Sequence, residues 1–141
     1  MALHKMAGHL IRRMNQNSNA IFVKRMQESG YDITPVQFAS MLTMKNNPEI
    51  EQSQIATHIA YDRATIGGVI DRLEQKGFIQ RVVGSRDRRA RLCSLTPLGE
   101  STLAKVLPVV ETLQTEILEG LNKQETEQFL SLAKKVIDFS E

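Results

Sequence analysis

The sequence has 141 residues, of which 41% are hydrophobic and 24% are charged, and its formal net charge is +2. This length suits a single domain with a real core and excludes two independent ones. No apolar run is long enough for a transmembrane helix, and the first residues lack the apolar stretch of a secretory signal. The single cysteine, Cys93, excludes an internal disulfide framework and favours a reducing compartment. We therefore expect a cytoplasmic protein with no membrane partner.

The charges are unevenly distributed along the chain. Residues 78–91 hold five arginines and one acid, whereas residues 107–141 hold seven acids and three lysines. This polarity gives the molecule one face that suits a polyanion such as DNA and another that does not. The alternative interpretation of the basic run is a solvated, charged loop.

The first half of the chain is predicted to be helical. Apolar residues at helical spacing indicate a helix over residues 4–29, ended by Gly30. Thr34 and Pro35 are typical of a helix start and open a second helix that ends near residues 46–48. A short third helix covers residues 53–60. The fourth runs over residues 63–76 behind an Asp62 N-cap and ends at Gly77, so these two form a helix-turn-helix.

A hairpin and two further helices are predicted to follow. Residues 78–83 and 91–95 have strand character and flank a basic turn at residues 84–90. Thr96 and Pro97 open a long helix that reaches about residue 118 and is bent at Pro108. Asn122 and Glu125 resemble a capping box before a last helix that ends near residue 139. The expected fold is mainly α with a small β-wing, that is, a winged helix-turn-helix.

The second helix of a helix-turn-helix lies in the major groove and reads bases with its N-terminal residues. Here Arg63 can pair with guanine, Ala64 allows close approach, and Thr65 can bond a phosphate or touch a thymine methyl group. Two consecutive glycines inside this helix, Gly67 and Gly68, each cost about 1 kcal/mol relative to alanine. Either DNA or a tightly packed neighbouring helix would require the space that they leave.

The wing arginines are predicted to contact phosphates or to enter a narrow minor groove. Asp87 would be repelled by phosphate, so we expect it to pair with a neighbouring arginine and to fix the hairpin. Strand alternation turns some of the arginines away from DNA. The predicted DNA-binding residues are Ser53, Arg63, Ala64, Thr65, Gly67, Gly68, Arg72, Arg86, Arg88 and Arg89.

Residues 62–100 resemble the multiple antibiotic resistance regulator (MarR) family. The motifs RLEQKG at residues 72–77 and LTPLG at residues 95–99 are similar to the family pattern. The wing matches at Arg86, Asp87 and Arg89, but Gly84 stands where the family has its first aspartate. The order of elements resembles the family over essentially the whole chain.

The resemblance implies a homodimer that reads a pseudo-palindromic operator in double-stranded DNA. Residues 1–141 would form one domain, with a DNA-binding lobe at residues 34–96 and a helical dimerisation lobe at residues 4–30 and 97–139. Family members commonly bind small aromatic carboxylates or phenols, and the recognition helix resembles regulators of aromatic-acid catabolism. The implied effector-binding residues are His9, Arg12, Arg13, Phe38 and Met41. The alternative is that His9 is structural and that the two arginines form surface or inter-subunit salt bridges.

Other chemistry is not indicated. Cys93 lies in a predicted wing strand and is interpreted as structural rather than redox-active. The three histidines have no metal-ligand spacing, and no nucleophile motif or phosphate loop is present, so no metal, cofactor or catalytic residue is predicted. The predicted function is a DNA-binding repressor released by an aromatic acid. The alternative is a winged-helix protein-interaction module without DNA binding.

Overall fold

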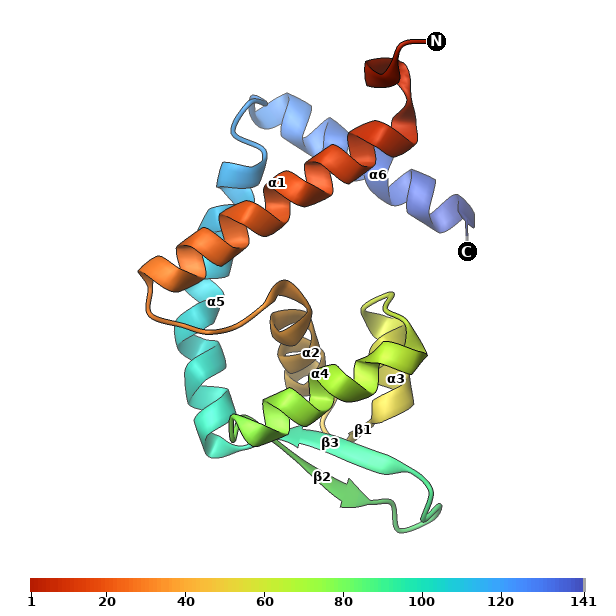
Figure 1. Cartoon of the computed structure of the whole chain (residues 1–141), viewed down its shortest axis with the longest axis vertical. Coiled ribbons are helices and arrows are strands. Elements are labelled where there is room, and N and C mark those ends of the chain that lie inside the picture. The colour runs from red at the N-terminus through yellow and green to blue at the C-terminus, as the bar shows by residue number, and fades with distance from the viewer. Residues whose placement is uncertain (141) are drawn as a thin grey trace.

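The computed structural model describes residues 1–140 and consists mainly of helices (Figure 1). A short 3₁₀ turn, η1, precedes six α-helices and three strands. In chain order these are η1 (Leu3–Lys5), α1 (Ala7–Glu28), α2 (Pro35–Asn46), β1 (Ile50–Glu51), α3 (Gln52–His58), α4 (Arg63–Gln75), β2 (Ile79–Val83), β3 (Arg91–Leu95), α5 (Pro97–Ile117) and α6 (Lys123–Ser140). The predicted winged helix-turn-helix with flanking helices is confirmed.

The helix starts follow the local capping signals in the sequence. The Thr34 hydroxyl accepts from the Gln37 backbone N–H at 3.2 Å, and the Gln37 side chain accepts from the Thr34 N–H at 3.2 Å. Each such cap stabilises a helix end by about 1 kcal/mol. The same capping role falls to Asp62, Thr96 and Asn122, which accept from the N–H groups of Ala64, Gly99 and Glu125. All four predicted starts are therefore confirmed.

Two predictions about local structure need correction. The first helix begins at Ala7 rather than at residue 4, because residues 3–5 form a separate 3₁₀ turn. The wing is also not an isolated hairpin. Strand β1 pairs antiparallel with β3, with Ile50 opposite Cys93, so the sheet has the order β1-β3-β2. A strand of two residues is too short to produce a pattern in the sequence.

The apolar side chains form two cores. The first lies between α2, α3, α4 and the sheet, and its buried members are Met41, Met44, Ile50, Ile55, Ala56, Ile66, Ile70, Leu73, Ile79, Cys93 and Leu103. The second lies mainly between α1 and α5 and contains Phe22, Met26, Ile33, Val106, Val110 and Leu113. Phe38 and Phe78 pack against both cores and so join the two parts of the molecule.

The C-terminal end of α4 is fastened to the segment between α1 and α2. The Lys76 ammonium group donates to the Asp32 carbonyl oxygen and, at 3.0 Å, to the buried Gln37 side chain. Gln37 is the residue that closes the capping box of α2, so one amide serves both contacts. This end of α4 is therefore anchored both through Lys76 and through the neighbouring Phe78.

Helix α6 leaves its apolar side chains in solvent. Leu132, Val136 and Ile137 are each about 60% exposed, and Leu10 and Ile11 of α1 are 44% and 56% exposed. Figure 1 shows α6 (blue) crossing the N-terminal half of α1. An apolar groove of about 560 Å³ runs between α1, the end of α5 and α6. This apolar surface lies at the opposite end of the molecule from the wing (Figure 1).

Candidate nucleic-acid interface

Helix α4 separates a buried side from an exposed N-terminal end. Ile66, Ile70 and Leu73 are buried in the first core, whereas Arg63 and Ala64 are exposed. Thr65 is exposed too, but its hydroxyl group already donates to the Asp62 carbonyl at 3.1 Å. A contact with a phosphate needs a hydrogen-bond donor, and this hydroxyl hydrogen is already used. The methyl group of Thr65 therefore remains for contact with a base. This helix end presents a guanidinium group and small apolar surfaces.

The two glycines of α4 are not required by packing inside the chain. A Cβ atom added at Gly68 would meet no atom within 4 Å, and one added at Gly67 would meet only the Gln52 amide nitrogen at 3.6 Å. That distance is an ordinary van der Waals contact. The tight packing against a neighbouring helix that the sequence left open is therefore absent. What remains is free space along the outer face of α4.

The wing turn carries exposed arginines on a braced backbone. The Arg86, Arg88 and Arg89 side chains are exposed. The Asp87 carboxylate accepts from the Arg89 backbone N–H at 2.9 Å and lies 3.4 Å from its guanidinium Nε. Arg91 donates to the Arg88 carbonyl at 3.1 Å. Asp87 thus pairs with a neighbouring arginine, as predicted, while Arg86 has no such partner among the described residues.

Gly84 closes the wing turn tightly. Its N–H donates to the Ala90 carbonyl at 3.0 Å. A Cβ atom at Gly84 would lie 2.7 Å from the Asp87 carbonyl oxygen and 3.3 Å from the Ala90 Cβ. An aspartate cannot occupy this position without opening the turn. The departure from the family pattern at Gly84 is therefore matched by the shape of this wing.

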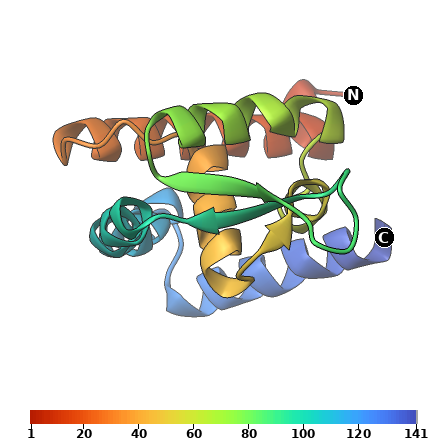
Figure 2. The ribbon, with the colours of Figure 1, turned by 90° about the horizontal axis from the view of Figure 1, so that it is seen from below.

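A hollow of about 280 Å³ lies between the wing and the two helices of the helix-turn-helix. Figures 1 and 2 show the hairpin of β2 and β3 running beside α4, with its turn towards the N-terminal end of that helix. The residues that line the hollow are Glu51, Gln52, Ser53, Arg63, Ile66, Arg89, Ala90 and Arg91. Three predicted residues, Ser53, Arg63 and Arg89, are thus brought together from separate elements. Three guanidinium groups at one concavity suit a phosphodiester backbone.

Other predicted DNA-binding residues lie outside this hollow. Arg72 is exposed in the second half of α4 and has no side-chain partner among the described residues. Arg86 and Arg88 lie on the wing turn. None of these three arginines lines the hollow, so they add positive charge elsewhere on α4 and on the wing turn.

Arg81 differs from the other arginines of the basic run. Its guanidinium group bonds the carboxylates of Glu74 and Asp71 at 2.9 and 2.7 Å and the Gln52 side chain at 3.2 Å. The Arg81 guanidinium lowers the pKa of the Glu74 carboxyl below its usual value. Sequence reasoning missed this network. Strand alternation could have found it, because Arg81 lies two residues after the buried Ile79 and so on the same face of β2.

The predicted effector residues do not meet in one chain. The Arg12 guanidinium lies 3.1 Å from the His9 ring nitrogen, and Arg13 is exposed beside them on α1. Phe38 packs on Phe22, with ring centroids 6.1 Å apart, and Phe22 lies about 14 Å along α1 from Arg13. Met41 has no exposed surface and belongs to the first core. Met41 is therefore a core residue in this chain, and the two halves of the predicted set lie apart.

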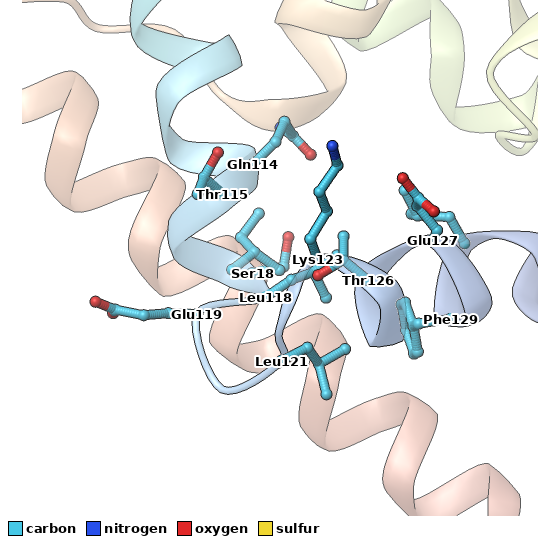
Figure 3. A pocket seen from close by; sticks show the side chains of 12 residues that line it. Ser18, Gln114, Thr115, Leu118, Glu119, Leu121, Lys123, Thr126, Glu127 and Phe129 are labelled. Carbon is cyan, nitrogen blue, oxygen red and sulfur yellow. The ribbon is translucent and has the colours of Figure 1, made fainter.

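A hollow of about 850 Å³ lies at the turn between α5 and α6 (Figure 3). Its walls are mainly apolar, with Leu118, Leu121 and Phe129 among the lining side chains. It adjoins the groove between α1 and α6, since Ser18, Ile117 and Leu118 line both. Sequence reasoning did not identify this hollow, because it depends on how α6 leaves α5.

Cys93 is buried at the centre of the sheet, between β1 and β2. Burial raises the pKa of the Cys93 thiol to about 11, so the group is a neutral thiol near neutral pH. This supports the structural interpretation. Among residues 1–140, no group of three His, Cys, Asp or Glu side chains could hold a metal ion. Within the same residues, no helix is both long and apolar enough to cross a membrane.

The sequence is similar to those of known transcriptional regulators. The family model described as MarR family matches residues 33–90. The transcriptional regulator HosA of Escherichia coli is 31% identical over 138 residues, which are 98% of this chain and 99% of HosA. The transcriptional repressor NicR of Pseudomonas putida is 29% identical over 95% of this chain and 84% of NicR.

Solved structures agree with the sequence comparison. BpsR of Bordetella bronchiseptica, whose DNA binding is regulated by 6-hydroxynicotinic acid, superposes with a TM-score of 0.90, 28% identity and coverage of 98% and 97% of the two chains. The repressor CouR, bound to a 23-mer DNA duplex, superposes with a TM-score of 0.84, 27% identity and coverage of 96% and 94%. With its fold, wing and sequence in agreement, the chain belongs to the MarR family of transcriptional regulators.

Proposed function

We propose that this chain is a transcriptional repressor that binds double-stranded DNA as a homodimer and releases it on binding a small aromatic acid. One observation carries the DNA-binding part: Arg63 of α4 and Arg89 and Arg91 of the wing meet at one hollow beside the exposed N-terminal end of α4. Of the residues that line it, Ser53, Arg63 and Arg89 belong to the DNA-binding set predicted from the sequence. DNA binding by CouR, which has the same fold, supports the assignment.

The dimer is supported by surface that the single chain leaves uncovered. The apolar side chains of α1 and α6 would cost free energy in water, and an isolated chain rarely exposes so many on adjacent helices. A second copy can cover them symmetrically. In this proposal, residues 34–96 form the DNA-binding lobe, and residues 4–30 and 97–139 form the dimerisation lobe. The hollow of Figure 3 belongs to the dimerisation lobe.

The effector class rests on the relatives. BpsR responds to 6-hydroxynicotinic acid, a hydroxylated aromatic carboxylic acid. In this chain, the Arg12 guanidinium and the neighbouring Arg13 provide the donors that a carboxylate needs. We infer that the chain acts by binding alone, without catalysis, and that it does so in the bacterial cytoplasm, where its DNA target lies.

Two alanine variants test the DNA interface. Arg86→Ala is expected to weaken binding to all duplexes about equally. It should also reduce the salt slope, that is, the slope of the logarithm of the binding constant against the logarithm of the salt concentration, by about one, because one phosphate contact is lost. Arg63→Ala is expected to weaken binding to the preferred sequence by about tenfold or more and to change random duplexes little. The measurement is fluorescence anisotropy over a salt series. The probes are a duplex enriched by the wild-type protein from a random library and a random duplex of the same length.

Wild-type protein that enriches no duplex would exclude the repressor and favour the protein-interaction module. Equal losses for both variants on both duplexes would remove the division of roles between α4 and the wing. Circular dichroism of each variant serves as the folding control.

The effector proposal is tested with 6-hydroxynicotinic acid and benzoate, using benzyl alcohol as a control without a carboxylate. At least one acid is expected to raise the unfolding temperature by about 2 °C or more and to weaken binding to the enriched duplex, because it binds the folded protein. Arg12→Gln is expected to abolish both effects. Unchanged effects in Arg12→Gln would move the site away from α1, and no effect of either acid would contradict the proposed class.

A further inference from the structure

We propose that Arg81 is a positioning residue for DNA recognition, which holds the wing and the recognition helix α4 at a fixed angle without touching DNA. This inference rests on the proposed function and adds to it. Arg81 is one of the five arginines in the basic run of residues 78–91, and the sequence assigned it no role. The structure assigns it to the inside of the interface instead.

The contacts of Arg81 join three elements. Its Nη2 atom donates to Asp71 at 2.7 Å and to Glu74 at 2.9 Å, and its Nε atom donates to the second Glu74 oxygen at 3.3 Å. Its Nη1 atom donates to the Gln52 side chain at 3.2 Å. Every nitrogen of the guanidinium group is thus engaged. Because Arg81 lies on β2, Gln52 on α3 and the two acids on α4, one rigid, planar group ties the wing to the helix-turn-helix.

The exposed fraction of the side chain separates Arg81, which binds other residues of the chain, from arginines that can contact DNA. The Arg81 side chain is 22% exposed, whereas the Arg89 side chain is 94% exposed. A phosphate near Arg81 would also meet the carboxylates of Asp71 and Glu74, which repel it. A contact with DNA would have to break two ion pairs first. Arg81 therefore serves the interface through the elements that it connects.

Recognition requires that the wing and α4 meet DNA together. The wing arginines bind the backbone or the minor groove while the N-terminal end of α4 meets bases in the major groove. Hydrogen bonds to base edges tolerate misplacement of only about 0.5 Å. Contacts with phosphates tolerate more, because they depend mainly on charge. Loss of the fixed angle should therefore reduce sequence preference more than overall affinity.

The first experiment compares Arg81→Gln with Arg86→Gln, which removes the same charge from an exposed part of the wing. Binding is measured by anisotropy on the enriched and random duplexes over a salt series. For Arg81→Gln we expect the preference for the enriched duplex to fall by about tenfold or more, as for the loss of one base contact, with an unchanged salt slope on the random duplex. Arg86→Gln should weaken both duplexes and reduce that slope by about one.

Arg81→Lys keeps the charge but not the planar group. One ammonium group cannot span Gln52, Asp71 and Glu74 in the same geometry, so this variant should restore only part of the preference. Full restoration would show that charge alone matters and would overturn the positioning role.

The second experiment removes the other side of the network. Asp71→Asn combined with Glu74→Gln takes two negative charges away from α4, so by charge alone it should strengthen binding to every duplex. The positioning role predicts equal or stronger binding to the random duplex but a loss of preference for the enriched one by about tenfold or more. This variant also serves if Arg81→Gln fails to fold.

The outcomes are distinct. An unchanged preference in the double variant, or a smaller salt slope in Arg81→Gln, would overturn the inference and make Arg81 structural or a phosphate contact. Wild-type protein that enriches no duplex would contradict the proposed function itself. In that case the failure appears before any variant is compared.

Discussion

Replacing Gly99 with alanine is expected to destabilise the chain by at least about 3 kcal/mol. Gly99 lies in the first turn of α5, where a Cβ atom would stand 1.9 Å from the Phe78 carbonyl oxygen and 2.8 Å from its carbonyl carbon. The Phe78 carbonyl cannot move freely, because it accepts the Thr96 N–H at 3.0 Å. Phe78 also packs against both cores, so any displacement of its backbone disturbs both.

Thermal and urea unfolding of Gly99→Ala measure this effect, with an expected fall in unfolding temperature of about 10 °C. Gly68→Ala is the matched control, since it adds the same methyl group within a helix where no atom lies within 4 Å. That control should gain about 0.5–1 kcal/mol from the higher helix propensity of alanine. If Gly99→Ala unfolded at the temperature of the wild type, the close approach of α5 to Phe78 would be wrong.

Replacing Val136 with aspartate is expected to convert the protein to monomers and to weaken binding to the enriched duplex by more than about 100-fold. Val136 is 63% exposed and lines the apolar groove between α1 and α6. In a symmetric interface the change occurs twice, and each buried carboxylate without a partner costs several kcal/mol. A monomer keeps one DNA-binding lobe and loses the second contact that a dimer makes on the same duplex.

Sedimentation velocity measures the assembly, and anisotropy measures the DNA affinity. Ser131→Asp adds the same charge to an exposed position of α6 that does not line this groove, and it should leave both unchanged. A Val136→Asp protein that remains dimeric would place the dimer interface elsewhere. A monomer that binds DNA as tightly as the wild type would remove the need for a dimer.

Features that depend on neighbours in the sequence were predicted well. The caps at Thr34, Asp62, Thr96 and Asn122 lie within three residues of the groups that they bond, so local chemistry alone sets these helix starts. The buried stripe of α4 follows from helical spacing, and the pairing of Asp87 with Arg89 spans only two residues. The wing followed from two strand-like segments around a basic turn.

Features that depend on contacts between distant residues were not predicted. Strand β1 exists because Ile50 meets Cys93, more than forty residues away in the sequence. The role of Arg81 depends on how β2 packs on α4, and the burial of Met41 depends on how α2 packs in the first core. The effector residues need such contacts too, since His9 and Phe38 come from different parts of the fold. Residue type and spacing therefore indicated which residues face DNA, but not the Arg81 contacts that hold the wing against α4.

Because α4 is anchored at Lys76, a rotation about that end would move the opposite end of the helix furthest. Its C-terminal end is held by the Asp32 carbonyl and the Gln37 side chain, while Arg63 stands at the opposite end. Thirteen residues separate the two, which is a length of about 20 Å. A rotation of about 3° around the anchored end would carry the backbone of Arg63 by about 1 Å and that of Gln75 hardly at all. Because Arg81 ties the wing to Asp71 and Glu74 of α4, the wing would have to move with the helix in such a rotation.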